Sequence, residues 1–81
     1  MKYTYVYILQ SVKREDRFYT GITDDLDARL RHHNQGCCDY TRPHIPWRIK
    51  TAIAFTDPEQ ARRFELYLKS PSGRAFAKKR L

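Results

Sequence analysis

The feature that most constrains the fold is a strict alternation of residue types at the start of the chain. Every second position carries a large side chain, in Tyr3, Tyr5, Tyr7 and Leu9, and threonine, valine, isoleucine and glutamine fill the positions between them. Successive side chains of a β-strand point to opposite faces, and aromatic and β-branched residues favour strands. The alternation therefore predicts a strand over residues 3–10.

A second strand-like run follows a short polar segment. Charged residues occupy positions 13–16, and the run Phe18–Thr23 then returns to aromatic, isoleucine and threonine side chains. Two such runs joined by a short polar segment are typical of an antiparallel hairpin. Gly21, inside the second run, indicates a β-bulge or a close approach of another group to the backbone.

A helix is expected next, ending at about Asn34. Thr23 or Asp24 is the expected N-cap, the first turn is rich in aspartate, and Gly36 follows just beyond the end. The face expected to pack on the sheet has the spacing i, i+4 and i+7 and carries Leu26, Leu30 and His33.

The remaining segments predict a loop, a third strand and two more helices. Residues 36–46 form the loop, and residues 47–55 alternate as a strand does. Asp57 and Pro58 are typical of a helix start, as cap and first helical residue, and Pro71 ends that helix near Ser70. A short basic helix over 73–80 closes the chain.

The order strand, strand, helix, strand, helix, helix predicts an α+β fold. Three short strands need a layer over their apolar face, and the helices supply it. A chain of 81 residues allows one domain, spanning 1–81, with a single small core.

Positive charge is concentrated in the last third of the chain. Residues 1–59 hold nine basic and eight acidic side chains, whereas residues 60–81 hold seven basic and one acidic side chain. Such a surface attracts polyanions, and phosphate neutralisation releases counterions, so nucleic acid is the first partner to consider. Anionic lipid and an acidic protein remain alternatives.

The chain shows no secretory signal and no apolar run long enough to cross a membrane, so we expect a cytoplasmic protein. The two cysteines, Cys37 and Cys38, are adjacent, and neighbouring residues are poorly placed for a disulfide. A second metal-binding pair is missing, so reduced thiols in a loop are expected.

Five polar side chains stand where packing alone would not require them: Tyr7, Tyr19, Arg29, His33 and Glu65. Arg29 and His33 are four residues apart and share one helical face. Glu65 is the single acid after Glu59, and a divalent ion can be held by one carboxylate when waters and phosphate oxygens complete its coordination.

Each of these residues also has a purely structural interpretation. The two tyrosines could be a cross-strand aromatic pair. Arg29 could form an ion pair with Asp25, His33 could be favoured by the helix end, and Glu65 could pair with Lys69.

The order of motifs resembles the GIY-YIG nuclease superfamily, in its small stand-alone bacterial subgroup. Tyr5-Val6-Tyr7 and Tyr19-Thr20-Gly21 are similar to its two-part signature, and the likeness spans nearly the whole chain. It continues through Thr23, Leu26, Arg29, Leu30, His33, Asn34, Gly36, Tyr40, Thr41, Pro46, Trp47 and Glu65, and through residues 67–69 and 72–76.

The resemblance implies a three-stranded antiparallel sheet flanked by helices and metal-dependent cleavage of DNA. It implies that Tyr7 and Tyr19 are the signature tyrosines, Arg29 the phosphate-binding arginine, His33 the helix histidine, and Glu65 the ligand of one Mg²⁺ or Mn²⁺. The asparagine that many relatives carry after the glutamate has no clear match here. Tyr7 and His33 both remain candidates for the general base, with Tyr19 adjusting it.

We therefore expect a metal-dependent endonuclease acting on single-stranded, branched or duplex DNA. The basic side chains expected to bind the nucleic acid are Arg29, Arg62, Lys69, Arg74, Lys78 and Lys79. Tyr40, Trp47 and Tyr67 are candidates for base stacking, with core packing as their alternative. A non-cleaving nucleic-acid-binding module and a cationic protein-interaction domain are the rival functions, and the oligomeric state is left open.

Overall fold

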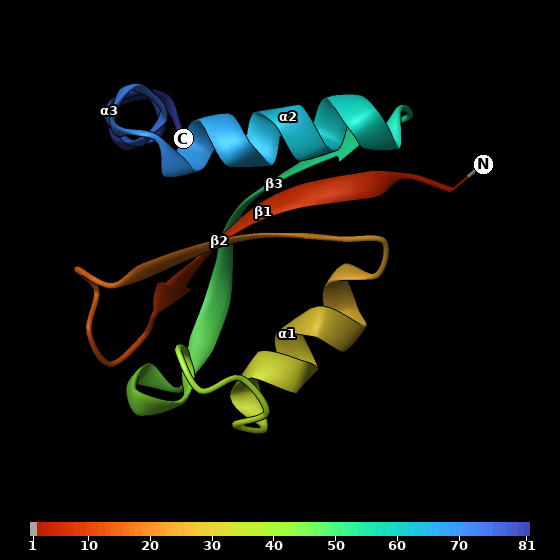
Figure 1. The fold of residues 1–81 in the computed structure, drawn as a ribbon. Helices are drawn as coiled ribbons and strands as arrows, with labels where there is room; N and C mark the ends of the chain where they lie inside the picture. Colours follow the sequence, from red (N-terminus) through yellow and green to blue (C-terminus); the bar gives the residue numbers. More distant parts are fainter. Residues whose placement is uncertain (1) are drawn as a thin grey trace.

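A three-stranded antiparallel sheet, in the order β2-β1-β3, forms the centre of the molecule. The computed structural model describes residues 2–81, so Met1 lies outside it. In chain order the elements are β1 (Thr4–Ser11), β2 (Phe18–Thr23), α1 (Leu26–Asn34), a short 3-10 helix (Arg42–His44), β3 (Trp47–Phe55), α2 (Pro58–Lys69) and α3 (Pro71–Arg80). Helices α2 and α3 lie on one side of the sheet and α1 lies on the other (Figure 1). The predicted α+β fold is confirmed.

Strands β1 and β2 form the predicted hairpin, and Tyr7 lies directly opposite Gly21. The pairing runs without a register shift, so Gly21 marks a close approach and not a bulge. A Cβ atom added to Gly21 would lie 2.3 Å from Tyr7 Oη and 2.5 Å from Tyr7 Cζ. The tyrosine ring therefore occupies space that only a glycine leaves free.

A bulge lies instead in the pairing of β1 with β3. Ile8 pairs with Thr51 and Leu9 with Ile49, so Lys50 has no partner opposite it. A bulge of this kind bends the strand and changes which face the next side chains occupy. Ile49 packs with Leu9 on the α1 side, whereas Phe55 packs on the α2 side. Strand β3 thus contributes apolar side chains to both faces of the sheet, whereas its regular alternation predicted a single face.

The first helix begins with a different cap from the one expected. Asp25 is the N-cap of α1, and its carboxylate accepts a hydrogen bond from Ala28 N at 3.0 Å. Thr23 Oγ1 instead accepts from Asp25 N and fixes the turn before the helix. Gly36, with φ of +79°, follows the helix end as predicted.

Helices α2 and α3 meet at Ser70, and α3 begins at Pro71 rather than at the expected residue 73. Proline ends the preceding helix but also fits the first position of a new one. Ser70 Oγ donates to Tyr67 O at 2.6 Å and accepts from Gly73 N at 3.1 Å. A Cβ on Gly73 would lie 1.7 Å from Tyr67 O, so the two helices pack tightly at this junction.

Two apolar clusters fill the two faces of the sheet. Val6 and Ile8 pack with α2, through Ala61 and Leu68. On the other face, the buried cluster consists of Tyr7, Leu9 and Trp47, covered by α1 and the following loop. Cys37 and Cys38 lie in that loop as free thiols, as expected. The cluster on the α1 face places a buried tyrosine hydroxyl beside the helix.

Candidate functional site

The centre of the site is a hydrogen bond between two buried side chains. Tyr7, in the middle of β1, and His33, in the last turn of α1, are both 2% exposed. Tyr7 Oη lies 3.2 Å from His33 Nε2. His33 faces the sheet because it follows Leu26 and Leu30 on the predicted apolar stripe of α1. The pairing connects the most buried strand to the helix by a polar contact.

Tyr19 extends this pair towards the surface. Its ring centroid lies 5.0 Å from that of His33 and 6.5 Å from that of Tyr7. The ring centroid of Tyr40 lies 5.9 Å from that of Tyr19, and Tyr40 is 72% exposed. Tyr7 and Tyr19 are not directly opposite each other, since their partners in the hairpin are Gly21 and Leu9. A row of aromatic rings thus leads from the buried hydroxyl to solvent.

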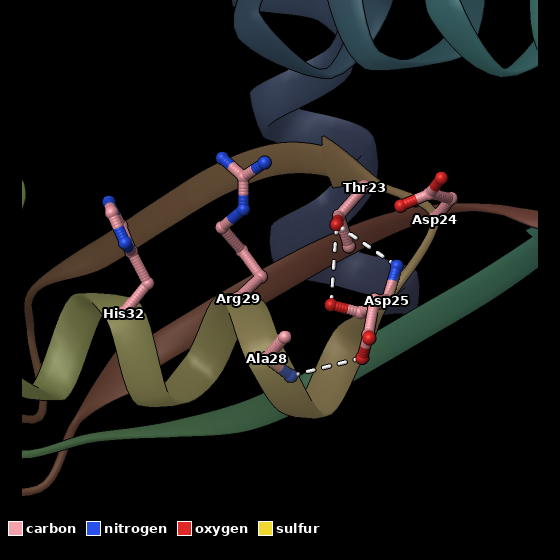
Figure 2. A pocket seen from close by; sticks show the side chains of 6 residues that line it. All are labelled: Thr23, Asp24, Asp25, Ala28, Arg29 and His32. Atoms are coloured by element: carbon pink, nitrogen blue, oxygen red, sulfur yellow. Dashed lines mark hydrogen bonds between the residues drawn. The ribbon is translucent and has the colours of Figure 1, made fainter.

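Arg29 lies one turn before His33 on α1 and is exposed. It lines a pocket of about 300 Å³ together with His32 and the turn from Thr23 to Asp25. Figure 2 shows Arg29 and His32 extending from the same side of the helix, with the Asp25 carboxylate engaged at Ala28. No ion pair joins Arg29 to an acid within residues 2–81. Its guanidinium is therefore available to an anion.

Burial and neighbouring charges shift the pKa values of the central pair. Burial, followed by the charge of Tyr19, raises the pKa of Tyr7 to about 12, although Arg29 opposes the shift. Burial also lowers the pKa of His33, and the positive charges of Arg29 and His32 add to that effect. Both groups are consequently neutral near pH 7. The interpretation of His33 as a charged residue favoured by the helix end is not consistent with this environment.

Glu65 comes from the other face of the sheet. It lies on the buried stripe of α2 with Ala61 and Leu68, and it is 8% exposed. Glu65 Oε2 is 2.5 Å from Lys69 Nζ, the ion pair that was the structural alternative. Its charge contributes, as the smallest cause, to the raised pKa of Tyr7. Tyr7, Tyr19, Arg29 and His33 therefore lie on the α1 side of the sheet, whereas Glu65 belongs to α2 on the other side and influences Tyr7 only weakly.

Glu65 is a single carboxylate, and this limits which metal ions the site could hold. Within residues 2–81 no three histidine, cysteine or acidic side chains are clustered. Zinc would need such a cluster, whereas magnesium keeps several waters and accepts one or two carboxylates. Glu65 fits a magnesium-type site completed by water and phosphate oxygens, provided that Lys69 moves aside.

A groove of about 950 Å³ lies beside β2. Aromatic side chains line it, in Phe18, Tyr19, Tyr40 and Trp47, and so do cations, in Arg17, Lys50, Lys69, Arg74 and Lys78. The groove includes three of the six basic residues expected to bind nucleic acid. The other three, Arg29, Arg62 and Lys79, do not line it, and Arg62 pairs with Glu59 at 2.7 Å.

The stacking candidates differ in their surroundings. Tyr40 is exposed along the groove, but Trp47 is 3% exposed and donates its indole N–H to Thr41 O at 2.8 Å. Tyr67 packs against Phe64 and Phe76, away from the groove lining. Core packing therefore describes Trp47, and Tyr40 is the candidate best placed for stacking.

Sequence reasoning assigned no role to several residues that the structure places at the site. Arg17 and Lys50 line the groove, and Thr41 Oγ1 lies 2.9 Å from His33 Nδ1. The positions of Arg17 in a turn and of Lys50 at a bulge carry no periodic pattern. Thr41 lies in an irregular loop, so only the run of family-like residues around it drew attention to it.

None of the helices in residues 2–81 has the length and apolar character needed to cross a bilayer.

Comparison with known proteins gives consistent matches. The GIY-YIG catalytic domain family matches residues 3–80. The UPF0213 protein BH0048 of Halalkalibacterium halodurans is 39% identical over 71 residues, which cover 86% of this chain and 73% of that protein. A UPF0213 protein of Clostridium perfringens, CPE1444, is 36% identical over 66 residues, covering 80% and 69%. The solution NMR structure of the Bacillus halodurans protein BH0048 matches with a TM-score of 0.56 and 37% identity, covering 96% of this chain and 81% of that one.

Proposed function

The chain belongs to the GIY-YIG catalytic domain family, and from this membership we propose that it is an endonuclease that hydrolyses DNA phosphodiester bonds with the aid of one divalent ion. The observation that carries the proposal is the buried hydrogen bond between Tyr7 and His33, which lies on the same helix as Arg29, and Arg29 forms no ion pair within residues 2–81. An oxygen in contact with a neutral imidazole can pass a proton on, and a free guanidinium can hold a phosphate.

Proton transfer from the attacking water requires both members of the pair. A tyrosine with a pKa of about 12 is a poor base near neutral pH. His33 is neutral but buried, and Tyr7 Oη lies against its Nε2. The water proton passes to Tyr7 Oη as the tyrosine proton passes to His33 Nε2. The water oxygen bonds to phosphorus, and the phosphorus–oxygen bond to the leaving group breaks.

Arg29 contacts the phosphate in this scheme. Its planar donors match two phosphate oxygens and stabilise the charge that develops during attack. Its positive charge also opposes protonation of His33, so a bound phosphate would offset that effect. Arg29 therefore links phosphate binding to the basicity of the pair.

Glu65 is the residue that would hold Mg²⁺ or Mn²⁺. When bound, the ion supplies charge neutralisation at the leaving oxygen. Lys69 now pairs with this carboxylate, and its side chain is 49% exposed, so it is free to turn towards a phosphate of the backbone. The negative charge of Glu65 would be balanced by Lys69 before the metal binds and by the metal ion afterwards.

The lining of the groove favours DNA with unstacked bases. Cations along a groove track the backbone, and exposed aromatic rings stack on any base. Tyr40 and Phe18 are 72% and 48% exposed beside Arg74 and Lys78. Single-stranded and branched DNA present free bases to such rings, whereas a continuous duplex does not.

The proposal is tested by incubating the full chain with labelled single-stranded, branched and duplex DNA, in the presence of Mg²⁺, Mn²⁺ or EDTA. Cleavage with metal, lost in Tyr7→Phe and kept in the matched control Tyr3→Phe, supports it. Salt-sensitive binding without any cleavage supports the non-cleaving module. Absence of both supports a protein-interaction domain.

A further inference from the structure

Thr41 is a fully buried residue held from three directions. It is 0% exposed, and its Oγ1 lies 2.9 Å from His33 Nδ1, on the opposite side of the imidazole from Tyr7. The same hydroxyl donates to Cys38 O at 3.4 Å. Its carbonyl accepts the indole N–H of Trp47 at 2.8 Å. A threonine in this position cannot rotate freely.

The loop that carries Thr41 is itself tied to the end of α1. Asn34, the neighbour of His33, accepts from Trp47 N at 2.7 Å and donates to Trp47 O at 3.0 Å. These two bonds set the distance between the helix end and the start of β3. The Thr41–His33 contact is thus fixed by the backbone on both sides.

The donors and acceptors around the imidazole can be counted. A hydroxyl has one proton, and Cys38 O, 3.4 Å away, is an acceptor for that of Thr41; with the proton placed there, Thr41 Oγ1 is an acceptor towards His33 Nδ1 at 2.9 Å. A neutral histidine carries one N–H, which then resides on Nδ1. Nε2 is left as an acceptor for the Tyr7 hydroxyl.

We propose that Thr41 is a positioning residue that holds neutral His33 in the Nδ1–H tautomer, so that Nε2 receives the proton of Tyr7. The inference rests on the proposed nuclease function for its catalytic meaning. In the other tautomer Nε2–H would donate to Tyr7 Oη, and the tyrosine proton would have no acceptor. The hydroxyl of Thr41 thus decides the direction of the hydrogen bond on the far side of the ring.

The tautomer is measured directly by ¹⁵N NMR of the imidazole nitrogens in the metal-free full chain. The resonances of His33 are assigned by their loss in His33→Gln, which separates them from His32 and His44. We expect a protonated Nδ1 and an unprotonated Nε2. A protonated Nε2 in the wild-type protein overturns the proposal.

Two variants test whether Thr41 causes this state. Thr41→Val keeps the shape but removes the acceptor, and it should shift His33 towards the Nε2–H tautomer. Single-turnover cleavage at saturating DNA should fall by about 10²-fold, the lower range of a general acid–base contribution. Thr41→Ser keeps the hydroxyl and should restore both the tautomer and the rate to near wild type.

A folded Thr41→Val protein that keeps the Nδ1–H tautomer overturns the role of Thr41. If that variant does not fold, the His33 tautomer measured in the wild-type protein and in Thr41→Ser still tests the proposal. The failure of the proposed function is seen separately, as absence of cleavage by the wild-type chain, and it leaves the tautomer measurement intact.

Discussion

Tyr7 and Gly21 face each other across the β1–β2 hairpin, and the tyrosine ring fills the space that a side chain at position 21 would need. The glycine of the second motif is therefore required by the tyrosine of the first. The end of the ring lies against Gly21, and its hydroxyl reaches His33 Nε2 at 3.2 Å.

Gly21→Ala should destabilise the protein, because the added Cβ would lie 2.3 Å from Tyr7 Oη and 2.5 Å from the ring atom Tyr7 Cζ. We expect a loss of about 1–3 kcal/mol in the free energy of unfolding, as for other overpacked sites. Urea denaturation measures it. Tyr7→Ala removes the obstructing ring, so the double variant Tyr7→Ala/Gly21→Ala should be more stable than the sum of the two single effects. Strict additivity would contradict the contact.

Glu65→Gln should abolish cleavage while DNA binding persists. The change removes the charge that we propose holds the metal and keeps the shape of the side chain, and losses of this type reach about 10²-fold or more in rate. The matched control is Glu59→Gln, because Glu59 also pairs with a cation on α2 but is exposed. Wild-type cleavage by a folded Glu65→Gln protein, free of contaminating nuclease, would refute the metal assignment.

One tyrosine should resist deprotonation up to a pH of about 12. Burial beside Tyr19 raises the pKa of Tyr7 to about 12, above its ordinary value of 10.0. Between these values the folded chain binds more protons than the unfolded chain, so stability should fall as the pH rises. Ultraviolet titration of the phenols detects the late step, which Tyr7→Phe should remove and Tyr3→Phe should leave.

Stability should fall when the pH drops below about 6.5, because burial and Arg29 lower the pKa of His33 from that value. The unfolded chain then binds a proton that the folded chain does not, and the loss continues until the pH passes the folded pKa. Thermal denaturation between pH 7 and pH 5 measures it. His33→Gln should flatten this part of the profile. An equal flattening by His32→Gln, a variant of the exposed neighbour, would assign the effect elsewhere.

Arg74→Ala and Lys78→Ala should each reduce the dependence of DNA affinity on salt by about one unit of logarithmic slope. Both residues line the groove, whereas Arg62 is outside it and pairs with Glu59. Arg62→Ala is therefore the control with an unchanged slope. Equal slopes for all three variants would place the DNA elsewhere on the surface.

Most elements could be predicted because their signals are local. The bounds of β2 and β3, and the start of α2 at Pro58, follow from alternation and capping residues. The pattern places the start of α3 two residues late, at 73, because Pro71 both ends one helix and begins another. The change of face at Lys50 was missed because a bulge depends on the partner strand, which no periodicity within β3 reveals.

The contacts within the candidate site could likewise be predicted only where the signal is local in the sequence. Arg29 and His33 were linked through their helical spacing, and the structure adds that Tyr7 meets the histidine. Thr41 could not be assigned a contact from the sequence, since an irregular loop brings it to His33 over eight residues. Long-range contacts between a loop and a helix have no repeating pattern that a sequence displays.

The change of face in β3 has a consequence for cooperativity. Ile49 contributes to the layer beneath α1, and Phe55 contributes to the layer beneath α2. Loss of either layer would expose part of the same strand and weaken its ladder with β1, so we expect the two layers to unfold together. We therefore expect the Tyr7–His33 pair on one face and the carboxylate of Glu65 on the other to be lost together on unfolding.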